Sequence, residues 1–250
     1  MSKPAPKGER GPFRADQIRP GDRYELSDGH PIYCAPTGSR GSRRNLIGGS
    51  VLDTDPLVTE AGIDTGYSPA PNALRAPDIA VGNVPDAPGW VAGSPPLAVE
   101  YADSGQDEQE LQDKIVDLMG AGTRFIWVVR LVGPRRVEVY EAGKPTRTVA
   151  EDGELVAPGI LENAVPVRAM YDREAAHEAT LRNLLQRRGY ASVEELRAEG
   201  KAAAILSVLA ARGFVPDDAL CARVLACRDD AELDRLLALA VTTASIDALG

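Results

Sequence analysis

Residues 77–140 decide the fold, and they include PDIAV (77–81), PPLAVEYA (95–102), QDEQELQDKIVDLMGAG (106–122) and FIWVVRL (125–131). The first, second and fourth of these segments are short apolar runs, which is the pattern of buried strands. The third segment is polar, with apolar residues at helical spacing, and it predicts a helix that ends at its glycines. We therefore predict an α/β fold, with the mixed sheet of an α+β domain and a helix between two of its strands.

Two of these strands each carry one carboxylate, Asp78 and Glu100, inside an apolar run. An unpaired charge is costly to bury, so both residues are expected at the rim of the sheet, near a cation. The helix that follows has a single lysine, Lys114, at the edge of its apolar stripe. Carboxylate oxygens are the ligands that Mg²⁺ prefers, so this pattern predicts a metal site. A structural alternative for Lys114 is an ion pair with Glu110, four residues before it.

Composition indicates a globular protein without a membrane-spanning segment. The chain has 250 residues and 44% of them are hydrophobic, which allows one large domain or one domain with an appendage. No apolar run is long enough to cross a bilayer, and the first residues lack the apolar block of a signal peptide. We therefore expect a cytoplasmic protein that has no membrane partner.

The net charge of −9 is unevenly distributed along the chain. Residues 1–44 sum to +4, whereas residues 45–122, which contain the predicted site, sum to −11. Such an acidic segment repels nucleic acid unless cations intervene. Residues 1–20 are expected to form a flexible basic arm. Arg40, Arg43 and Arg44 are a dense basic cluster that either contacts phosphates or begins a solvated helix.

The remaining segments place a helical region after the predicted catalytic domain. Residues 22–34 predict two short strands around a turn, and residues 42–52 predict a helix. The domain is expected to span residues 21–170, and residues 171–250 change to an Ala-, Leu-, Arg- and Glu-rich composition. Four helices are predicted there, at 172–188, 192–213, 216–228 and 230–245. They are expected to mediate oligomerisation or to dock a protein partner.

The segments RYELSDGHPIYCAPTG, PDIAV, PPLAVEYADSG, ELQDKIVDLMGAG and FIWVVRLVGPRRVEVYEAG occur in this order within residues 23–141. Together they resemble the Uma-two family of proposed restriction endonucleases, which lies within the PD-(D/E)XK nuclease superfamily. The resemblance covers about half of the chain. It implies a restriction-endonuclease-like core, followed here by a small all-helical C-terminal region.

The resemblance also implies a metal-dependent endonuclease that hydrolyses DNA. Asp78, Glu100 and the Tyr101 carbonyl would bind Mg²⁺ or Mn²⁺, with Glu25 as a possible additional ligand. Lys114 would stabilise the negative charge of the transition state. The side chains expected to contact DNA phosphates are those of Arg40, Arg43, Arg44, Arg135 and Arg136.

The chain departs from the family pattern at several positions. The superfamily commonly places its lysine two residues after the second acid, where this chain has Ala102. The Uma-two type instead places it on the following helix, and Lys114 fits that position. The other departures are Gly41 in place of a histidine, Leu118 in place of a tyrosine, and Phe125 and Arg130 in place of acidic residues.

Two readings compete with a DNA endonuclease. In the first, the fold is a catalytically weak binding or scaffold module within a larger complex, which the overall acidity favours. In the second, the metal site acts on RNA or on a nucleotide. One fold hosts many functions, so the resemblance does not decide between these readings.

Overall fold

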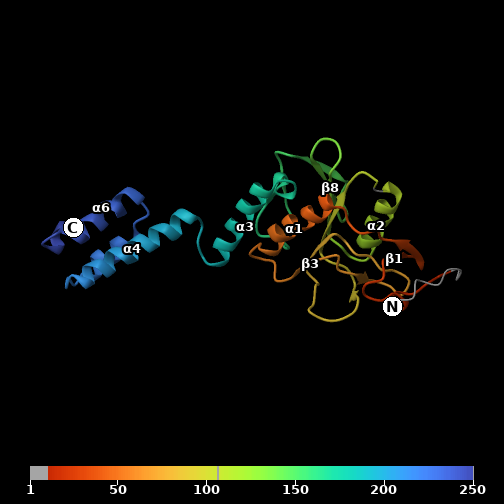
Figure 1. The fold of residues 1–250 in the computed structure, drawn as a ribbon, viewed down its shortest axis with the longest axis horizontal. Coiled ribbons are helices and arrows are strands. Elements are labelled where there is room, and N and C mark those ends of the chain that lie inside the picture. Colours follow the sequence, from red (N-terminus) through yellow and green to blue (C-terminus); the bar gives the residue numbers. More distant parts are fainter. Residues whose placement is uncertain (1–10, 106, 250) are drawn as a thin grey trace. The chain divides into compact units, whose positions relative to one another are not determined.

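A computed structural model describes residues 11–105 and 107–249 of the protein, which separate into two compact units, 1–184 and 185–250 (Figure 1). The elements of the first unit are η1 (Ala15–Gln17), β1 (Tyr24–Ser27), β2 (His30–Tyr33), α1 (Ser39–Asp53), β3 (Ala61–Ile63), β4 (Tyr67–Ser68), β5 (Ile79–Val81), β6 (Val91–Ala92), β7 (Leu97–Ala102), α2 (Glu108–Gly120), β8 (Phe125–Arg130), β9 (Arg136–Glu141), β10 (Arg147–Ala150), β11 (Glu154–Leu155), β12 (Val165–Pro166), η2 (Val167–Met170) and α3 (Arg173–Arg187).

A six-stranded mixed sheet organises the first unit, in the order β10-β9-β8-β7-β5-β3. Strands β7 and β8 are parallel because α2 returns the chain to the edge at which β7 began, and Glu100 lies opposite Val128 in their register. The other neighbouring pairs in this sheet are antiparallel. The predicted α/β fold with a mixed sheet is therefore confirmed.

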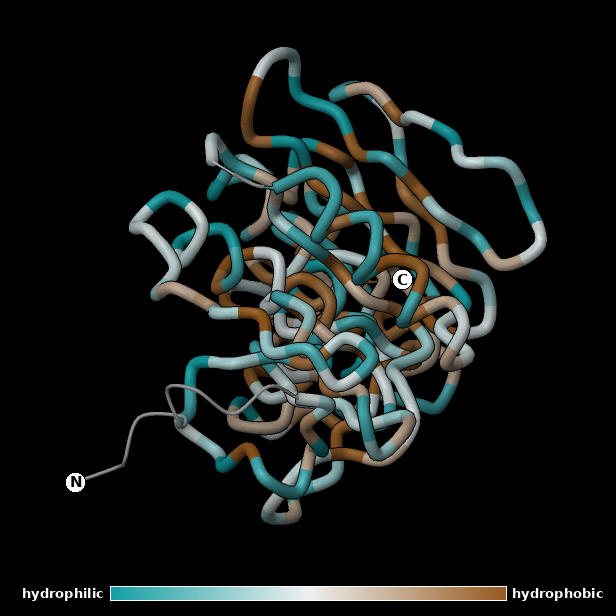
Figure 2. Tube along the Cα trace, turned by 90° about the vertical axis from the view of Figure 1, so that its right-hand side faces the viewer, coloured by the Kyte–Doolittle hydropathy of each residue, from teal (hydrophilic) through white to brown (hydrophobic). Residues whose placement is uncertain are grey.

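Alternation along β7 and β8 creates two separate cores. Val99 and Trp127 belong to the larger core, which includes Val51 and Leu52 of α1. Ala98, Ile126 and Val128 point to the other face and pack with Leu111, Ile115 and Leu118 of α2. Successive side chains of a strand point to opposite faces, so α1 and α2 cover different faces of the sheet, as Figure 1 shows. Most loops at the edge of the view in Figure 2 are polar or neutral in hydropathy.

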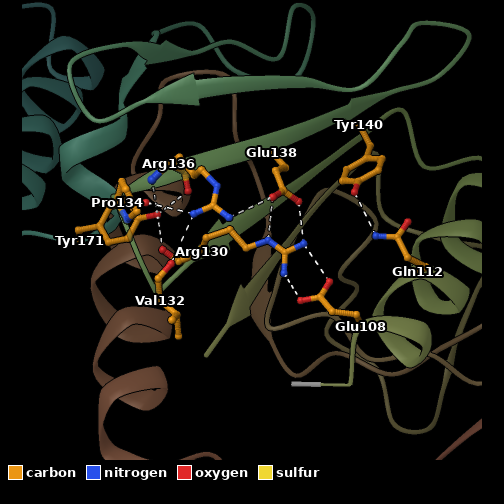
Figure 3. A network of polar contacts seen from close by, with 9 residues as sticks. All are labelled: Glu108, Gln112, Arg130, Val132, Pro134, Arg136, Glu138, Tyr140 and Tyr171. Atoms are coloured by element: carbon orange, nitrogen blue, oxygen red, sulfur yellow. Dashed lines mark hydrogen bonds and ion pairs between the residues drawn. The ribbon is translucent and has the colours of Figure 1, made fainter. Parts of the chain in front are cut away.

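A polar network ties α2 to the hairpin formed by β8 and β9 (Figure 3). Arg130 donates to both oxygens of Glu138, at 2.9 and 2.8 Å, and also pairs with Glu108 at the start of α2. One turn further along α2, Gln112 donates to the hydroxyl of Tyr140 at 3.2 Å. Arg130, which stands where the family pattern has an acidic residue, therefore holds in place the helix that carries Lys114.

The second half of the predicted basic arm is packed rather than flexible. Residues 1–10 lie outside the described part of the chain, but Ala15 and Ile18 are buried with Leu26 and Leu74. The indole Nε1 of Trp90 donates to the carbonyls of Ala15 and Ile18, at 3.1 and 3.0 Å. The apolar residues of this short segment cover the β1–β2 hairpin, and the count of basic residues did not reveal that contact.

The helix α3 packs on the first unit, although the sequence placed it in the helical tail. Ala176 and Ala179 are buried in the larger core. The side chain of Asn183 donates to the Val51 carbonyl at 3.0 Å and accepts from Asn163 at 3.1 Å. The division between the units consequently falls near residue 184, after the predicted boundary at 170.

The second unit is helical, with α4 (Val193–Ala211), α5 (Asp218–Ala226), α6 (Asp230–Thr242) and η3 (Ile246–Leu249). Ile205 and Leu209 of α4 are buried with Val224 of α5 and with Leu233 and Leu236 of α6. The four predicted C-terminal helices are thus present. Among the described residues, no helix combines the length and apolar character that a membrane crossing requires.

Two adjacent glycines of α1 provide a test of how closely this helix approaches the sheet. A Cβ atom at Gly48 would collide with the buried Tyr101 hydroxyl, whereas one at Gly49 would lie at an ordinary 3.4 Å from Ile63. We expect Gly48→Ala to lower the free energy of unfolding by about 1–3 kcal/mol. Gly49→Ala should instead raise it by up to about 1 kcal/mol, because alanine favours a helix.

Urea unfolding followed by tryptophan fluorescence measures this difference, since both tryptophans, Trp90 and Trp127, belong to the first unit. Equal effects of the two substitutions would contradict the close packing of α1 on Tyr101.

Candidate active site

Four residues singled out in the sequence meet in one cleft of about 740 Å³. Asp78 directly precedes β5, Glu100 lies within β7, Lys114 lies in the middle of α2, and Glu25 lies on β1. Glu100 shares the face of β7 that α2 covers, because it alternates with Val99 and Tyr101. The predicted gathering of Asp78, Glu100 and Lys114 is therefore present in the structure.

The ammonium of Lys114 lies between two carboxylates. Its Nζ atom is 2.9 Å from Glu100 Oε1 and 3.2 Å from Glu25 Oε1, and it donates to the Ala76 carbonyl at 2.7 Å. Burial by itself would lower the pKa of Lys114, but the surrounding carboxylates, with Glu100 first, raise it above its ordinary value. Lys114 is thus a largely buried cation turned toward the sheet. It pairs with Glu100 and Glu25 and not with Glu110, the partner in the structural alternative.

Asp78 is held by groups from two other elements. The side-chain amide of Asn45, on α1, donates to Asp78 Oδ1 at 3.1 Å, and the backbone N–H of Tyr101, on β7, donates to Oδ2 at 2.7 Å. Each carboxylate oxygen can accept more than one bond. The carboxylate of Asp78 is therefore oriented in advance and retains acceptor capacity.

Negative charge is in excess around Glu100. Burial raises the pKa of Glu100 to about 8; the Lys114 ammonium opposes this shift, and the Asp78 carboxylate adds to it. Asp64, which follows β3 and lines the same cleft, also has a raised pKa, first through burial and then through Asp78. Since β3 pairs with β5, the sheet brings Asp64 beside Asp78. Asp64 was not predicted from the sequence, because no apolar run marks its strand.

Arg75 is a second buried cation that the sequence analysis did not single out. Its Nη1 atom is 3.3 Å from Glu25 Oε2, and its Nη2 atom is 2.7 Å from Asp117 Oδ2, on α2. Ser27 donates to the same Asp117 oxygen at 2.9 Å. Both oxygens of Glu25 thus face a cation, which favours a role in holding Lys114 over the metal-ligand role that the resemblance implied.

The donor set fits a hard divalent cation. Asp78 and Glu100 supply oxygen ligands beside an excess of negative charge that a cation would neutralise. Within residues 11–105 and 107–249, no group of three or more His, Cys, Asp or Glu side chains is arranged to hold a metal ion. An ion would therefore complete its coordination with water or backbone oxygen, and the role of the Tyr101 carbonyl stays a prediction.

The arginines predicted to contact phosphates lie in two places. Arg40 lies in the first turn of α1 and pairs with Asp103, a cleft residue, at 2.9 Å, and Arg43 and Arg44 follow it on the same helix. Arg135 and Arg136 precede and begin β9, and they do not line the cleft among the described residues. Arg135 pairs with Glu151 at 2.7 Å, and Arg136 lies 3.7 Å from Glu138.

Comparisons with known proteins agree with this fold. The family model described as "Uma2: Putative restriction endonuclease" matches residues 13–168. The crystal structure of a protein from Anabaena variabilis, described as a putative nuclease belonging to DUF820, is similar with a TM-score of 0.56 and 16% sequence identity. The similarity covers 66% of this chain and 99% of that one. No curated protein matches the chain.

The buried network around Arg75 makes a prediction about stability. Replacing Arg75 with methionine leaves Glu25 and Asp117 without their shared cation, and we expect it to cost about 3–5 kcal/mol of unfolding free energy. Ser27→Ala removes one neutral donor from the same network and should cost only about 0.5–1.5 kcal/mol.

The double variant Arg75→Met/Glu25→Gln should recover part of the loss, because it removes one of the two carboxylates that lose an ion pair with Arg75. Urea unfolding followed by tryptophan fluorescence distinguishes these outcomes. The interpretation fails if Arg75→Met costs no more than Ser27→Ala.

Proposed function

The chain belongs to the Uma2 family, whose model matches more than half of it, and from this we propose that the protein is a metal-dependent endonuclease that hydrolyses DNA phosphodiester bonds. The observation that carries the proposal is the Lys114 ammonium, 2.9 Å from Glu100, in the cleft that also contains Asp78. Two carboxylates and a cation are the parts that metal-assisted hydrolysis of a phosphodiester requires.

Asp78 and Glu100 would hold Mg²⁺ or Mn²⁺ in this proposal. When bound, such an ion lowers the pKa of a bound water and withdraws charge from the phosphate. Asp78 needs little rearrangement to bind it, because Asn45 and the Tyr101 N–H already fix its carboxylate.

Lys114 would stabilise the negative charge that develops on the phosphate. An ion bound to Glu100 competes with Lys114 for that carboxylate, but the ammonium keeps Glu25 and the Ala76 carbonyl as partners. A donor held in place before the reaction stabilises the transition state without a reorganisation cost. Glu25 and Arg75 act on catalysis through the position of Lys114.

The scaffold reading and the role of the C-terminal helices remain part of the proposal. A scaffold does not need Lys114 to be buried between two carboxylates, so this contact favours an active site.

For the second unit we propose oligomerisation or the docking of a protein partner. Val215, Leu225 and Val241 support this role because they are exposed apolar side chains on that unit.

Cleavage of supercoiled plasmid DNA with Mg²⁺ or Mn²⁺ tests the proposed activity. We expect the wild type to nick the plasmid, and Glu100→Gln and Lys114→Met each to lower the rate by about 10²–10³-fold, as is typical when one stabilising group is lost. Asp113→Asn is the matched control, because it removes an exposed carboxylate from the same helix.

Nicking that persists in both active-site variants would place the activity elsewhere. A wild type that binds Mn²⁺ but cleaves no nucleic acid would favour the scaffold reading. Parallel assays with RNA and with mononucleotides identify the substrate if DNA is not cleaved.

Metal affinity should depend on pH because a proton and a metal ion compete for Glu100. Burial raises the pKa of Glu100 to about 8, so below this pH the carboxylate is increasingly protonated. We expect the Mn²⁺ affinity to rise by up to about tenfold per pH unit as pH approaches 8, and to level off above it. Titration calorimetry measures the affinity, and a constant value over this range would contradict the assignment of Glu100 as a ligand.

A further inference from the structure

We propose that the cleft takes single-stranded DNA, with unpaired bases stacked on Tyr33, rather than intact duplex. This inference rests on the proposed nuclease function and names the substrate class of the same site. Three observations support it: the charges that line the cleft, the ion pairs that the nearby arginines already make, and an exposed aromatic side chain at the cleft wall.

The cleft lining is strongly acidic. Among the described residues, it contains eight carboxylate side chains and three basic ones, Arg23, Arg75 and Lys114. Two of these three cations are committed to buried ion pairs, Arg75 with Glu25 and Asp117, and Lys114 with Glu25 and Glu100. One or two divalent ions would offset only part of this negative charge. The electrostatic attraction to phosphates, which dominates duplex binding, is therefore weak in this cleft.

Among the described residues, the cleft lining contains none of the five arginines predicted to contact phosphates, Arg40, Arg43, Arg44, Arg135 and Arg136. Arg40, at its edge, is neutralised by Asp103 at 2.9 Å. Arg135 and Arg136, outside the lining, face Glu151 and Glu138. A duplex has about twice the phosphate charge per unit length of a single strand, so an acidic cleft penalises a duplex more.

Tyr33 offers a different source of binding energy. It lies on β2 opposite Tyr24 of β1, and the two rings meet edge to face with centroids 5.8 Å apart. Tyr24 packs against the small core of Ala15, Ile18 and Leu26, whereas Tyr33 is 59% exposed and lines the cleft. The Tyr33 ring, supported by Tyr24, thus presents an apolar surface to the cleft that also contains Asp78 and Glu100.

Stacking on such a ring requires an unpaired base. Proteins that bind single strands combine base stacking on aromatic side chains with a positively charged groove along the backbone, and stacking tolerates any sequence because every base has a π-face. In this acidic cleft, Lys114 and a bound divalent ion would be the cations that meet the backbone, and stacking would supply the remaining binding energy. Bases inside a duplex are already stacked and paired, so they gain nothing from Tyr33. If the tyrosine pair serves only as a cross-strand contact that stabilises the β1–β2 hairpin, substitution of Tyr33 has no effect on DNA binding.

Fluorescence anisotropy of the full chain with a labelled short oligodeoxynucleotide, single-stranded or annealed to its complement, tests the proposal in the presence of Ca²⁺. We expect tighter binding of the single strand. Tyr33→Ala should weaken single-strand binding by about 5- to 100-fold, the range for one lost stacking contact. Tyr33→Phe, which keeps the ring, should bind like the wild type. Tyr190→Ala, which removes a tyrosine outside the cleft lining, should also leave binding unchanged.

Thermal unfolding of each variant separates binding from folding, because Tyr33→Ala must retain the first unit for its affinity to be compared. If Tyr33→Ala does not fold, Tyr33→Leu keeps an apolar side chain without a ring and replaces it. Equal or tighter binding of duplex, no binding of either oligonucleotide, or unchanged affinity in the variant without the ring would overturn the proposal.

Cleavage assays on the same oligonucleotides with Mg²⁺ or Mn²⁺ distinguish this inference from the proposed function. Metal-dependent cleavage of duplex with no effect of Tyr33 overturns the single-strand inference and leaves the nuclease standing. Ring-dependent binding of the single strand without cleavage of any substrate supports the inference and rejects the nuclease. An RNA strand of the same sequence shows whether the cleft distinguishes the sugar.

Discussion

The contact on which the rest of the first unit depends is the Lys114 ammonium between the carboxylates of Glu100 and Glu25, at 2.9 and 3.2 Å. A buried charge is tolerated only when it is paired and hydrogen-bonded, and this one is satisfied by groups from a sheet strand, the β1–β2 hairpin and the carbonyl of Ala76. Without the two carboxylates, the ammonium would lose both of its ion-pair partners. The same contact therefore joins the fold and the candidate site.

Two sets of ion pairs hold the helix that carries Lys114, one close to the site and one farther away. Close by, Arg75 connects Glu25 to Asp117, one turn after Lys114 on α2. Farther away, Arg130 holds Glu108 at the start of the same helix and Glu138 on β9 (Figure 3). Both arginines fix the helix through these ion pairs. Departures from the family pattern, such as Arg130, can thus preserve the position of the reactive groups while changing what holds them.

The site combines fixed geometry with an unbalanced charge. Asp78 is oriented by Asn45 and the Tyr101 N–H, yet the cleft around Glu100 contains more carboxylates than cations. A divalent ion bound as proposed would reduce this imbalance. The same excess of carboxylates would repel a polyanionic duplex, so in the proposed function the charge that favours a metal also limits the substrates that can enter the cleft.

The sequence by itself determined the strands and helices around the site and the identity of its central residues. Apolar runs with one carboxylate each are conspicuous at Asp78 and Glu100, and helical spacing placed Lys114 beside an apolar stripe. These signals are local, because they depend on the period of a strand or a helix and on the cost of burying a charge.

Only the tertiary structure decided which groups surround these residues. Asp64, Arg75 and Asn45 reach the site through strand pairing and through the packing of α1, and no local pattern marks them. The docking of residues 11–20 and the attachment of α3 to the first unit likewise depend on contacts between segments far apart in the chain. Periodicity specifies which face of an element is apolar, but the partner of that face is chosen by the packing of the whole unit.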